Sequence, residues 1–77
     1  MTMLEALQRA VKLAGGQSAL ARRIQVKQQT VHYWLSVGKK ASADYARKIE
    51  EAVGGQVTRY ELRPDVFGEP IERERAA

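Results

Sequence analysis

The sequence of 77 residues predicts an all-α domain of four to five short helices. Apolar residues recur at three- and four-residue steps in separate stretches, glycine pairs at 15–16 and 54–55 interrupt these stretches, and strand patterns are scarce. The chain is short enough for a single domain, and without cysteine its core must come from side-chain packing. We expect this domain to span residues 1–68 and residues 69–77 to form a flexible tail.

The first predicted helix has a start signal, an apolar stripe and a stop signal. Thr2 and Glu5 have the T-x-x-E spacing of a capping box. Gly15 and Gly16 end the helix, because glycine adopts the left-handed cap conformation at low cost. The stripe between them consists of Leu4, Leu7, Val11 and Ala14. We interpret this helix as scaffold.

Two further predicted helices are separated only by Gln25 and Val26. The first begins at residue 17 or 18 and ends at 24, and the second runs from about residue 27 to 35 or 36. So short a connection predicts a sharp corner between them. In the first helix Ala21 allows close approach of a neighbour, and the residues expected to face inward are Ala19, Leu20 and Ile24.

The C-terminal part predicts one longer helix and one helical turn. After a loop at 37–41, Ser42 is a candidate N-cap for a helix over 43–53, with Asp44 in its first turn. Its buried stripe should consist of Ala46, Ile49 and Val53. Thr58 and Glu61 repeat the capping-box spacing.

Residues 63–65 follow that helical turn and predict a further turn of the chain. Val66 and Phe67, directly after them, are expected to fold back on the core as apolar anchors.

The charge is unevenly distributed along a chain of net charge +4 and pI about 9.8. Residues 9–48 hold nine Lys or Arg and one acid, Asp44, whereas residues 61–77 hold five acids and three arginines. A basic body indicates a polyanion partner, most simply nucleic acid. Ordinary solubilising charge is the alternative. The amphipathic N-terminal segment is neither a signal peptide nor a membrane span, and we expect a cytoplasmic protein.

The stretch QQTVHYWL, residues 28–35, separates polar from apolar residues when placed on a helix. At about 100° per residue, Val31, Trp34 and Leu35 share one side. The opposite side carries Gln28, Gln29, His32 and Tyr33. A polar face of this kind suits the DNA major groove, where a glutamine amide can pair with both N6 and N7 of adenine. An ordinary amphipathic helix with a solvated polar face is the alternative.

Residues 17–35, QSALARRIQVKQQTVHYWL, resemble the helix-turn-helix of the phage Cro/repressor family. Together with ASADYARKIEEAVGG and VTRYELRPDVFG, the chain up to Gly68 is similar to YdaS-type prophage regulators, which are sometimes described as antitoxins. This resemblance implies a lambda-repressor-like fold. One departure is Gln25, which occupies a turn position where the family usually has glycine.

The resemblance also implies residue roles. Gln17 would bind a phosphate and could support Gln28, and Thr30 would contact phosphate or pack inward. One of Arg22 and Arg23 would reach phosphate. Lys39 and Lys40 would meet the flanking DNA backbone or form a solvated loop pair. The DNA-facing positions would be Lys27, Gln28, Gln29, His32 and Tyr33, and Trp34 would belong to the core.

The function expected from these features is sequence-specific binding of double-stranded DNA by a Cro-like repressor, as a dimer on a two-fold operator. The dimer surface would involve the helix over 43–53 or the region of Val66 and Phe67. The alternative is an antitoxin that binds a protein toxin through residues 57–77, with Ile71 as anchor. One histidine, no cysteine and no phosphate-binding loop argue against an enzyme, a metal site or a cofactor. RNA binding is a third interpretation.

Overall fold

Six α-helices and one π-helical segment account for most of residues 2–68, the part of the chain that the computed structural model describes. In chain order they are α1 (Met3–Ala14), α2 (Gln17–Ile24), α3 (Gln28–Tyr33), η1 (Trp34–Gly38), α4 (Ala43–Ala52), α5 (Arg59–Leu62) and α6 (Pro64–Phe67). The all-α class predicted from the sequence is confirmed. The predicted tail at 69–77 lies outside the described residues. No helix within residues 2–68 is long and apolar enough to cross a membrane.

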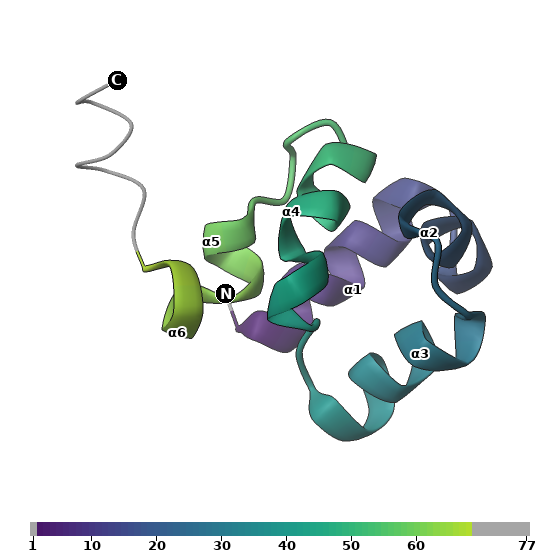
Figure 1. Ribbon diagram of the computed structural model, residues 1–77, viewed down its shortest axis with the longest axis horizontal. Coiled ribbons are helices and arrows are strands. Elements are labelled where there is room, and N and C mark those ends of the chain that lie inside the picture. Colours follow the sequence, from purple (N-terminus) through teal and green to yellow (C-terminus); the bar gives the residue numbers. More distant parts are fainter. Residues whose placement is uncertain (1, 69–77) are drawn as a thin grey trace.

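Helix α1 runs through the middle of the molecule, with α2 and α3 at one end and α5 and α6 at the other (Figure 1). Helix α2 packs against α1, α3 and α4, and α5 packs against α1, α4 and α6. One core joins these contacts. Its fully buried larger side chains are Leu7, Leu20, Ile24, Val31, Ile49, Val57 and Leu62.

Helix α1 begins and ends as predicted. The backbone N–H of Thr2 donates to the Glu5 carboxylate at 2.8 Å, and the N–H of Glu5 donates to the Thr2 hydroxyl at 3.0 Å. Gly15 adopts a left-handed backbone with φ 100°. The buried face differs from the predicted stripe, because Ala6 and Ala10 are fully buried while Leu4 and Val11 are only half-buried. Alanine fits this face because neighbouring helices approach closely.

The corner between α2 and α3 depends on a left-handed residue. Gln25 has φ 61° and ψ 46°, a conformation that costs a non-glycine residue about 1 kcal/mol. Its N–H donates to the carbonyls of Ala21 and Arg22, and the next N–H, of Val26, donates to Ala21 at 2.9 Å. The chain therefore keeps the left-handed corner despite lacking glycine there.

The predicted C-terminal end of the third helix was wrong. We expected the helix to stop at residue 35 or 36 and residues 37–41 to form a loop, but helical structure continues through η1 to Gly38. Lys39 then adopts a left-handed backbone with φ 60°, and the N–H of Lys40 donates to the Trp34 carbonyl at 3.2 Å. The hydroxyl of Ser36 donates to the His32 carbonyl at 2.7 Å, a local bond that competes with the α-helical pattern.

Helix α4 lies close to its predicted bounds, but its start differs in detail. Ser42 occupies the N-cap position with an extended backbone, yet its side chain makes no capping hydrogen bond. Asp44 lies in the first turn as expected. Ala46, Ile49 and Val53 are buried, which confirms the predicted stripe.

Two single-turn helices complete the described chain. The capping box of Thr58 and Glu61 forms and begins α5. The predicted turn at 63–65 was wrong: Pro64 begins α6, because its fixed φ suits the first helical position. Phe67 packs on the core as expected, whereas Val66 is 52% exposed and is not an anchor.

Arg63 ties this end of the chain to the segment that follows η1. Its guanidinium donates to the Ala41 carbonyl at 3.1 Å and to both carboxylate oxygens of Asp65 at 2.9 and 2.8 Å. The two bonds to its carboxylate lower the pKa of Asp65 to about 2. The bond to Ala41 ties Arg63, which precedes α6, to the segment before α4.

Candidate nucleic-acid interface

The third helix has one buried and one exposed side, as the sequence predicts. Val31 is fully buried and Trp34 is 6% exposed. The Trp34 ring packs at a tilt against the ring of Tyr45, with 5.8 Å between ring centroids. Trp34 is therefore a core residue and is not available to stack on a base. It anchors η1, which continues α3, to α4.

The exposed side of α3 collects the hydrogen-bonding residues. Gln28, Gln29, His32 and Tyr33 are all exposed, and Thr30 is half-buried at the edge of this face. The amides, imidazole and phenol can donate and accept hydrogen bonds without bringing a fixed charge. Such groups suit recognition of base edges more than attachment to phosphates. Their location agrees with the predicted site, and their binding role stays a prediction.

A hydrogen bond joins the two helices of the corner. The Ser18 hydroxyl on α2 donates to the side-chain oxygen of Gln28 on α3 at 2.7 Å. We had expected Gln17 to support Gln28. Gln17 is instead half-buried at the first position of α2, and its neighbour Ser18 makes the bond. Sequence reasoning missed Ser18, although Ser18 and Gln28 both lie in the first turns of helices that only three residues separate.

The two helices of the corner begin without side-chain caps. Neither Gly16, the N-cap of α2, nor Lys27, the N-cap of α3, makes a capping hydrogen bond through a side chain. The N–H groups of a first helical turn have no partner within their helix. They therefore leave donors and a positive helix end beside the polar face of α3.

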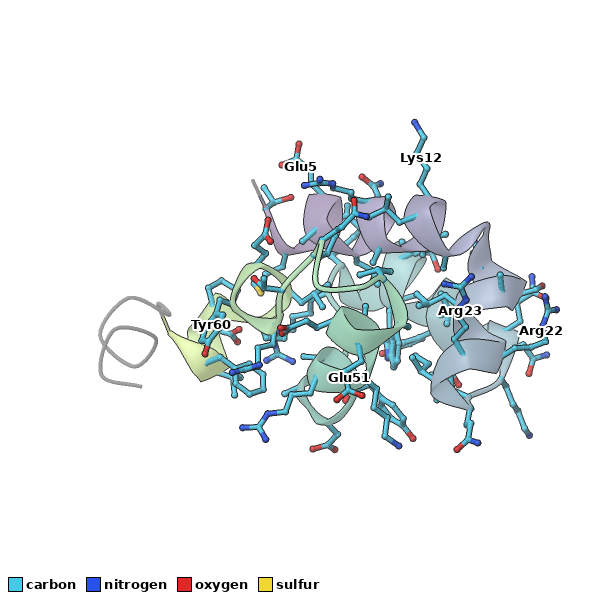
Figure 2. The ribbon with its side chains drawn as sticks, turned by 90° about the horizontal axis from the view of Figure 1, so that it is seen from above. Glu5, Lys12, Arg22, Arg23, Glu51 and Tyr60 are labelled. Carbon is cyan, nitrogen blue, oxygen red and sulfur yellow. The ribbon has the colours of Figure 1, made fainter. Side chains whose placement is uncertain are left out.

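The two arginines of α2 have different surroundings. Arg23 donates to the Ala52 carbonyl at the end of α4, at 2.8 Å. Figure 2 shows Arg22 at the outer edge of α2 and Arg23 closer to the rest of the fold. Both residues are exposed, but Arg23 holds two helices together. Arg22 is therefore the better candidate for a phosphate contact, as one of the two was predicted to be.

Three lysines flank α3 and η1. Lys27 lies at the start of α3, while Lys39 and Lys40 follow the end of η1, and all three are exposed. The charge of Lys40 contributes to the lowered pKa of Asp65, after the larger effect of Arg63. The positive charge of Lys40 thus interacts with the Asp65 carboxylate. Lys27 and Lys39 are therefore the stronger candidates for phosphate contacts.

The remaining chemistry of the described residues is sparse. An open cleft of about 550 Å³ lies between α2 and α4, lined by Arg23, Ile24, Gln25, Lys48, Glu51 and Ala52. Glu51 is its one carboxylate. Within residues 2–68 no three His, Cys, Asp or Glu side chains lie together in a way that could hold a metal ion.

Comparison with known proteins identifies the family of this chain. A family model described as "Bacterial toxin YdaS" matches residues 7–71. The chain belongs to the YdaS family. The resemblance predicted from the motifs at 17–35 and 57–68 is therefore confirmed.

Two relatives show how this YdaS-family chain compares with named proteins. The "Putative transcriptional regulator YdaS" of Escherichia coli K12 is 39% identical over 57 residues, which are 74% of this chain and 58% of that protein. The chain thus matches little more than half the length of this relative. A solved structure, the "Cro protein from putative prophage element Xfaso 1 in Xylella fastidiosa strain Ann-1", is 33% identical. It superimposes with a TM-score of 0.76 over 90% of this chain and 100% of its own.

Proposed function

We propose that this chain binds double-stranded DNA in a sequence-specific way and regulates transcription as a Cro-like repressor. The observation that carries the proposal is the exposed, uncharged face of α3, opposite buried Trp34 and beside exposed lysines. The major groove admits one helix and presents a distinct donor and acceptor pattern for each base pair. The regulator and Cro descriptions of the two relatives support the same function.

In this proposal the residues divide between base recognition and phosphate contact. Gln28, Gln29, His32 and Tyr33 contact base edges in the groove. The phosphate contacts come from cationic and helix-start residues, namely Gln17, Arg22, Lys27, Lys39 and Lys40, with Thr30 at the edge. The net charge of +4 favours association with a polyanion. No catalytic step and no cofactor is part of this function, and its DNA target places the protein in the cytoplasm.

We propose that the chain acts as a dimer on a two-fold operator, with half-sites about one helical turn apart. One short helix reaches only a few base pairs, so a second copy adds the specificity that a regulator needs. Val66, which is 52% exposed, and the outer face of α4 are the candidate contact surfaces.

Selection of bound sequences from random duplex DNA tests this function. The expected result is enrichment of one motif with two-fold symmetry. Recovery of unenriched sequences at moderate salt would contradict specific recognition, and an asymmetric motif would contradict the dimer. Measuring the mass of the free and bound protein by sedimentation separates these two outcomes.

A second candidate is a role in a toxin–antitoxin pair, because the matching family model carries a toxin description. We had expected residues 57–77 to bind a protein toxin. Val57 and Leu62 are fully buried, and Tyr60 is 8% exposed, so this part of the segment belongs to the core. The anchor Ile71 lies outside the described residues.

Truncation after Gly68 separates the two candidates, because the described fold ends there. Under the DNA-binding function the truncated chain keeps its operator affinity. Under the antitoxin function it loses the ability to neutralise a co-expressed toxin. A chain that inhibits growth by itself, with no effect of operator DNA, would favour a toxin over both.

A further inference from the structure

The segment η1 exposes an aliphatic side chain on the outside of the molecule. Val37 is 61% exposed, and within residues 2–68 it is the most exposed of the large hydrophobic side chains, ahead of Tyr33 at 56%. Because apolar surface is more stable away from water, a ligand that covers Val37 gains free energy. A single exposed hydrophobic residue needs no explanation by itself, so the surroundings of Val37 decide its role.

Tyr33 and Val37 lie on one side of the helical segment. They are four residues apart, which is close to one turn in both the α-helix and the wider π-helix. The Tyr33 ring extends toward the end of η1, because its Cε1 lies 3.7 Å from the place that a Cβ on Gly38 would take. Since Gly38 has no side chain, the ring edge and Val37 form a small apolar patch, which we call the η1 patch (Tyr33, Val37 and Gly38).

The η1 patch continues the polar face of α3, because Tyr33 belongs to both. Along this face the side chains change from amides at Gln28 and Gln29 to an aliphatic group at Val37. Lys39, two residues beyond Val37, is exposed and positively charged. Val37 therefore lies between proposed base contacts and a proposed phosphate contact, and a duplex that meets Tyr33 and Lys39 also reaches Val37.

The size of the η1 patch indicates the kind of ligand that covers it. One valine and one ring edge offer far less area than the about 800 Å² per partner of a standard protein interface. The other exposed large hydrophobic residues, Leu13 and Val66, belong to α1 and α6. A methyl group is small enough for this patch, and the C5-methyl group of thymine is the apolar feature that base pairs present in the major groove.

We infer that Val37, together with the edge of the Tyr33 ring, recognises the C5-methyl group of a pyrimidine in the major groove. Thymine carries this group, and 5-methylcytosine presents the same group at the same ring position. The inference rests on the proposed DNA-binding function. It adds a base-contacting residue that lies outside α3, in a segment that we had expected to be a loop.

Removal of single methyl groups from the selected operator tests the inference. Each thymine is replaced in turn by deoxyuridine, which pairs with adenine in the same way and lacks only the methyl group. At one position of the half-site this change should weaken wild-type binding about 4-fold, the worth of burying one methyl-sized group. Val37→Ala should bind the thymine and deoxyuridine operators equally at that position.

A second arm of the experiment separates the two sources of the methyl group. Each cytosine of the operator is compared with 5-methylcytosine at the same position. A Val37-dependent effect at a thymine position identifies thymine as the ligand, whereas about 4-fold tighter binding to a methylated cytosine, lost in Val37→Ala, identifies 5-methylcytosine. If no C5-methyl group changes the affinity of the wild type, the inference is overturned.

Two variants serve as controls. Val66→Ala is matched to Val37→Ala, because Val66 is also a valine and is 52% exposed, but it lies on α6. It should leave every ratio of affinities between methylated and unmethylated operators unchanged. Val37→Ile keeps an aliphatic side chain and should preserve the ratio at the Val37 position. Circular dichroism should show that all three variants are folded, since both positions are exposed.

Two results contradict the inference and leave the proposed function intact. Equal weakening of Val37→Ala on methylated and unmethylated operators would show that Val37 does not recognise the methyl group. Methyl sensitivity that persists in Val37→Ala at every position would assign this recognition to another residue. If selection enriches no sequence for the wild type, the proposed function fails, and the inference fails with it.

Discussion

Helices α1 and α5 begin in one way, and helices α2 and α3 begin in another. Thr2 with Glu5, and Thr58 with Glu61, form complete capping boxes that satisfy backbone donors at the start of α1 and α5. Gly16 and Lys27 provide no such bond at the starts of α2 and α3. The starts of α1 and α5 thus have side-chain caps, whereas the starts of α2 and α3 have none.

A missing side-chain cap does not by itself indicate a binding surface, because it must also adjoin exposed polar residues. Helix α4 also begins without a side-chain cap, since Ser42 makes no capping bond. That start lies beside Ala41, which is fully buried and whose carbonyl accepts from Arg63. At the corner, by contrast, the uncapped starts adjoin an exposed polar helix face. The capped helices therefore belong to the scaffold, and the uncapped corner coincides with the proposed binding surface.

The largest expected effect is on the scaffold. Leu62 is fully buried at the end of α5, so Leu62→Ala should lower the free energy of unfolding by about 2–5 kcal/mol. Urea unfolding followed by circular dichroism measures it. An effect below about 1 kcal/mol would show that the C-terminal turns are not part of one cooperative fold. Leu13→Ala, at a residue 40% exposed, is the matched control and should cost much less.

The next effect concerns the corner. Gln29→Ala should weaken operator binding by about 1–3 kcal/mol and relax preference at one base position, because it removes a base contact. Its unfolding free energy should hardly change, since Gln29 is exposed. Titration of operator variants measures both affinity and preference. Equal weakening on every sequence would remove Gln29 from the base contacts.

A smaller effect is expected when a scaffold cap is removed. Thr58→Ala deletes the hydroxyl that accepts from the Glu61 N–H and should cost about 1 kcal/mol of stability. Operator affinity of the folded protein should stay constant. Thermal unfolding gives the first quantity and a binding titration the second. Reduced affinity at a temperature where the variant is fully folded would contradict the division between scaffold and corner.

Adding a cap at the corner should move stability and binding in opposite directions. Lys27 has the extended backbone of an N-cap, with φ −74° and ψ 148°, so Lys27→Ser should stabilise the fold by about 0.5–1 kcal/mol. It should also weaken DNA binding on all sequences and reduce the salt slope by about one. Lys12→Ser on α1 is the control for loss of a distant cation. An unchanged salt slope would remove Lys27 from the phosphate contacts.

The smallest effect is the acid sensitivity of the Arg63–Asp65 pair. The pKa of Asp65 is lowered from 3.8 to about 2, chiefly by its hydrogen bonds from Arg63. A lowered pKa means that the pair stabilises the fold above about pH 4 and loses this contribution as the pH falls toward 2. The unfolding midpoint of the wild type should fall more steeply across this range than that of Asp65→Asn. Parallel curves would show that the pair does not contribute.

Short-range signals in the sequence predicted much of the fold. The capping boxes depend on residues three apart, and the end of α1 depends on Gly15, so neighbouring residues contain the information. Burial of Val31 and Trp34 followed from helical periodicity alone. The exposed face of α3 was predictable for the same reason.

The features that sequence reasoning missed depend on contacts between distant residues. The bond from Ser18 to Gln28 requires the angle of the corner, and the choice of Arg23 over Arg22 for the Ala52 carbonyl requires the position of α4. Arg63 similarly reaches back to Ala41 across 22 positions. The extension through η1 was missed because a π-helical turn has no distinctive residue pattern.

The segment that contains α3 and η1 is preceded by Gln25 and followed by Lys39, and both residues have a left-handed backbone. Between them, the side chain of Trp34 is buried in the core. Burial of Trp34 therefore ties the orientation of this segment to the core. Under the proposed DNA-binding function, new target sequences should be acquired through exchange of its solvent-facing side chains, one at a time, while the orientation of the helix stays constant. Under this proposal, related chains should differ in the DNA sequences they recognise and still share one backbone.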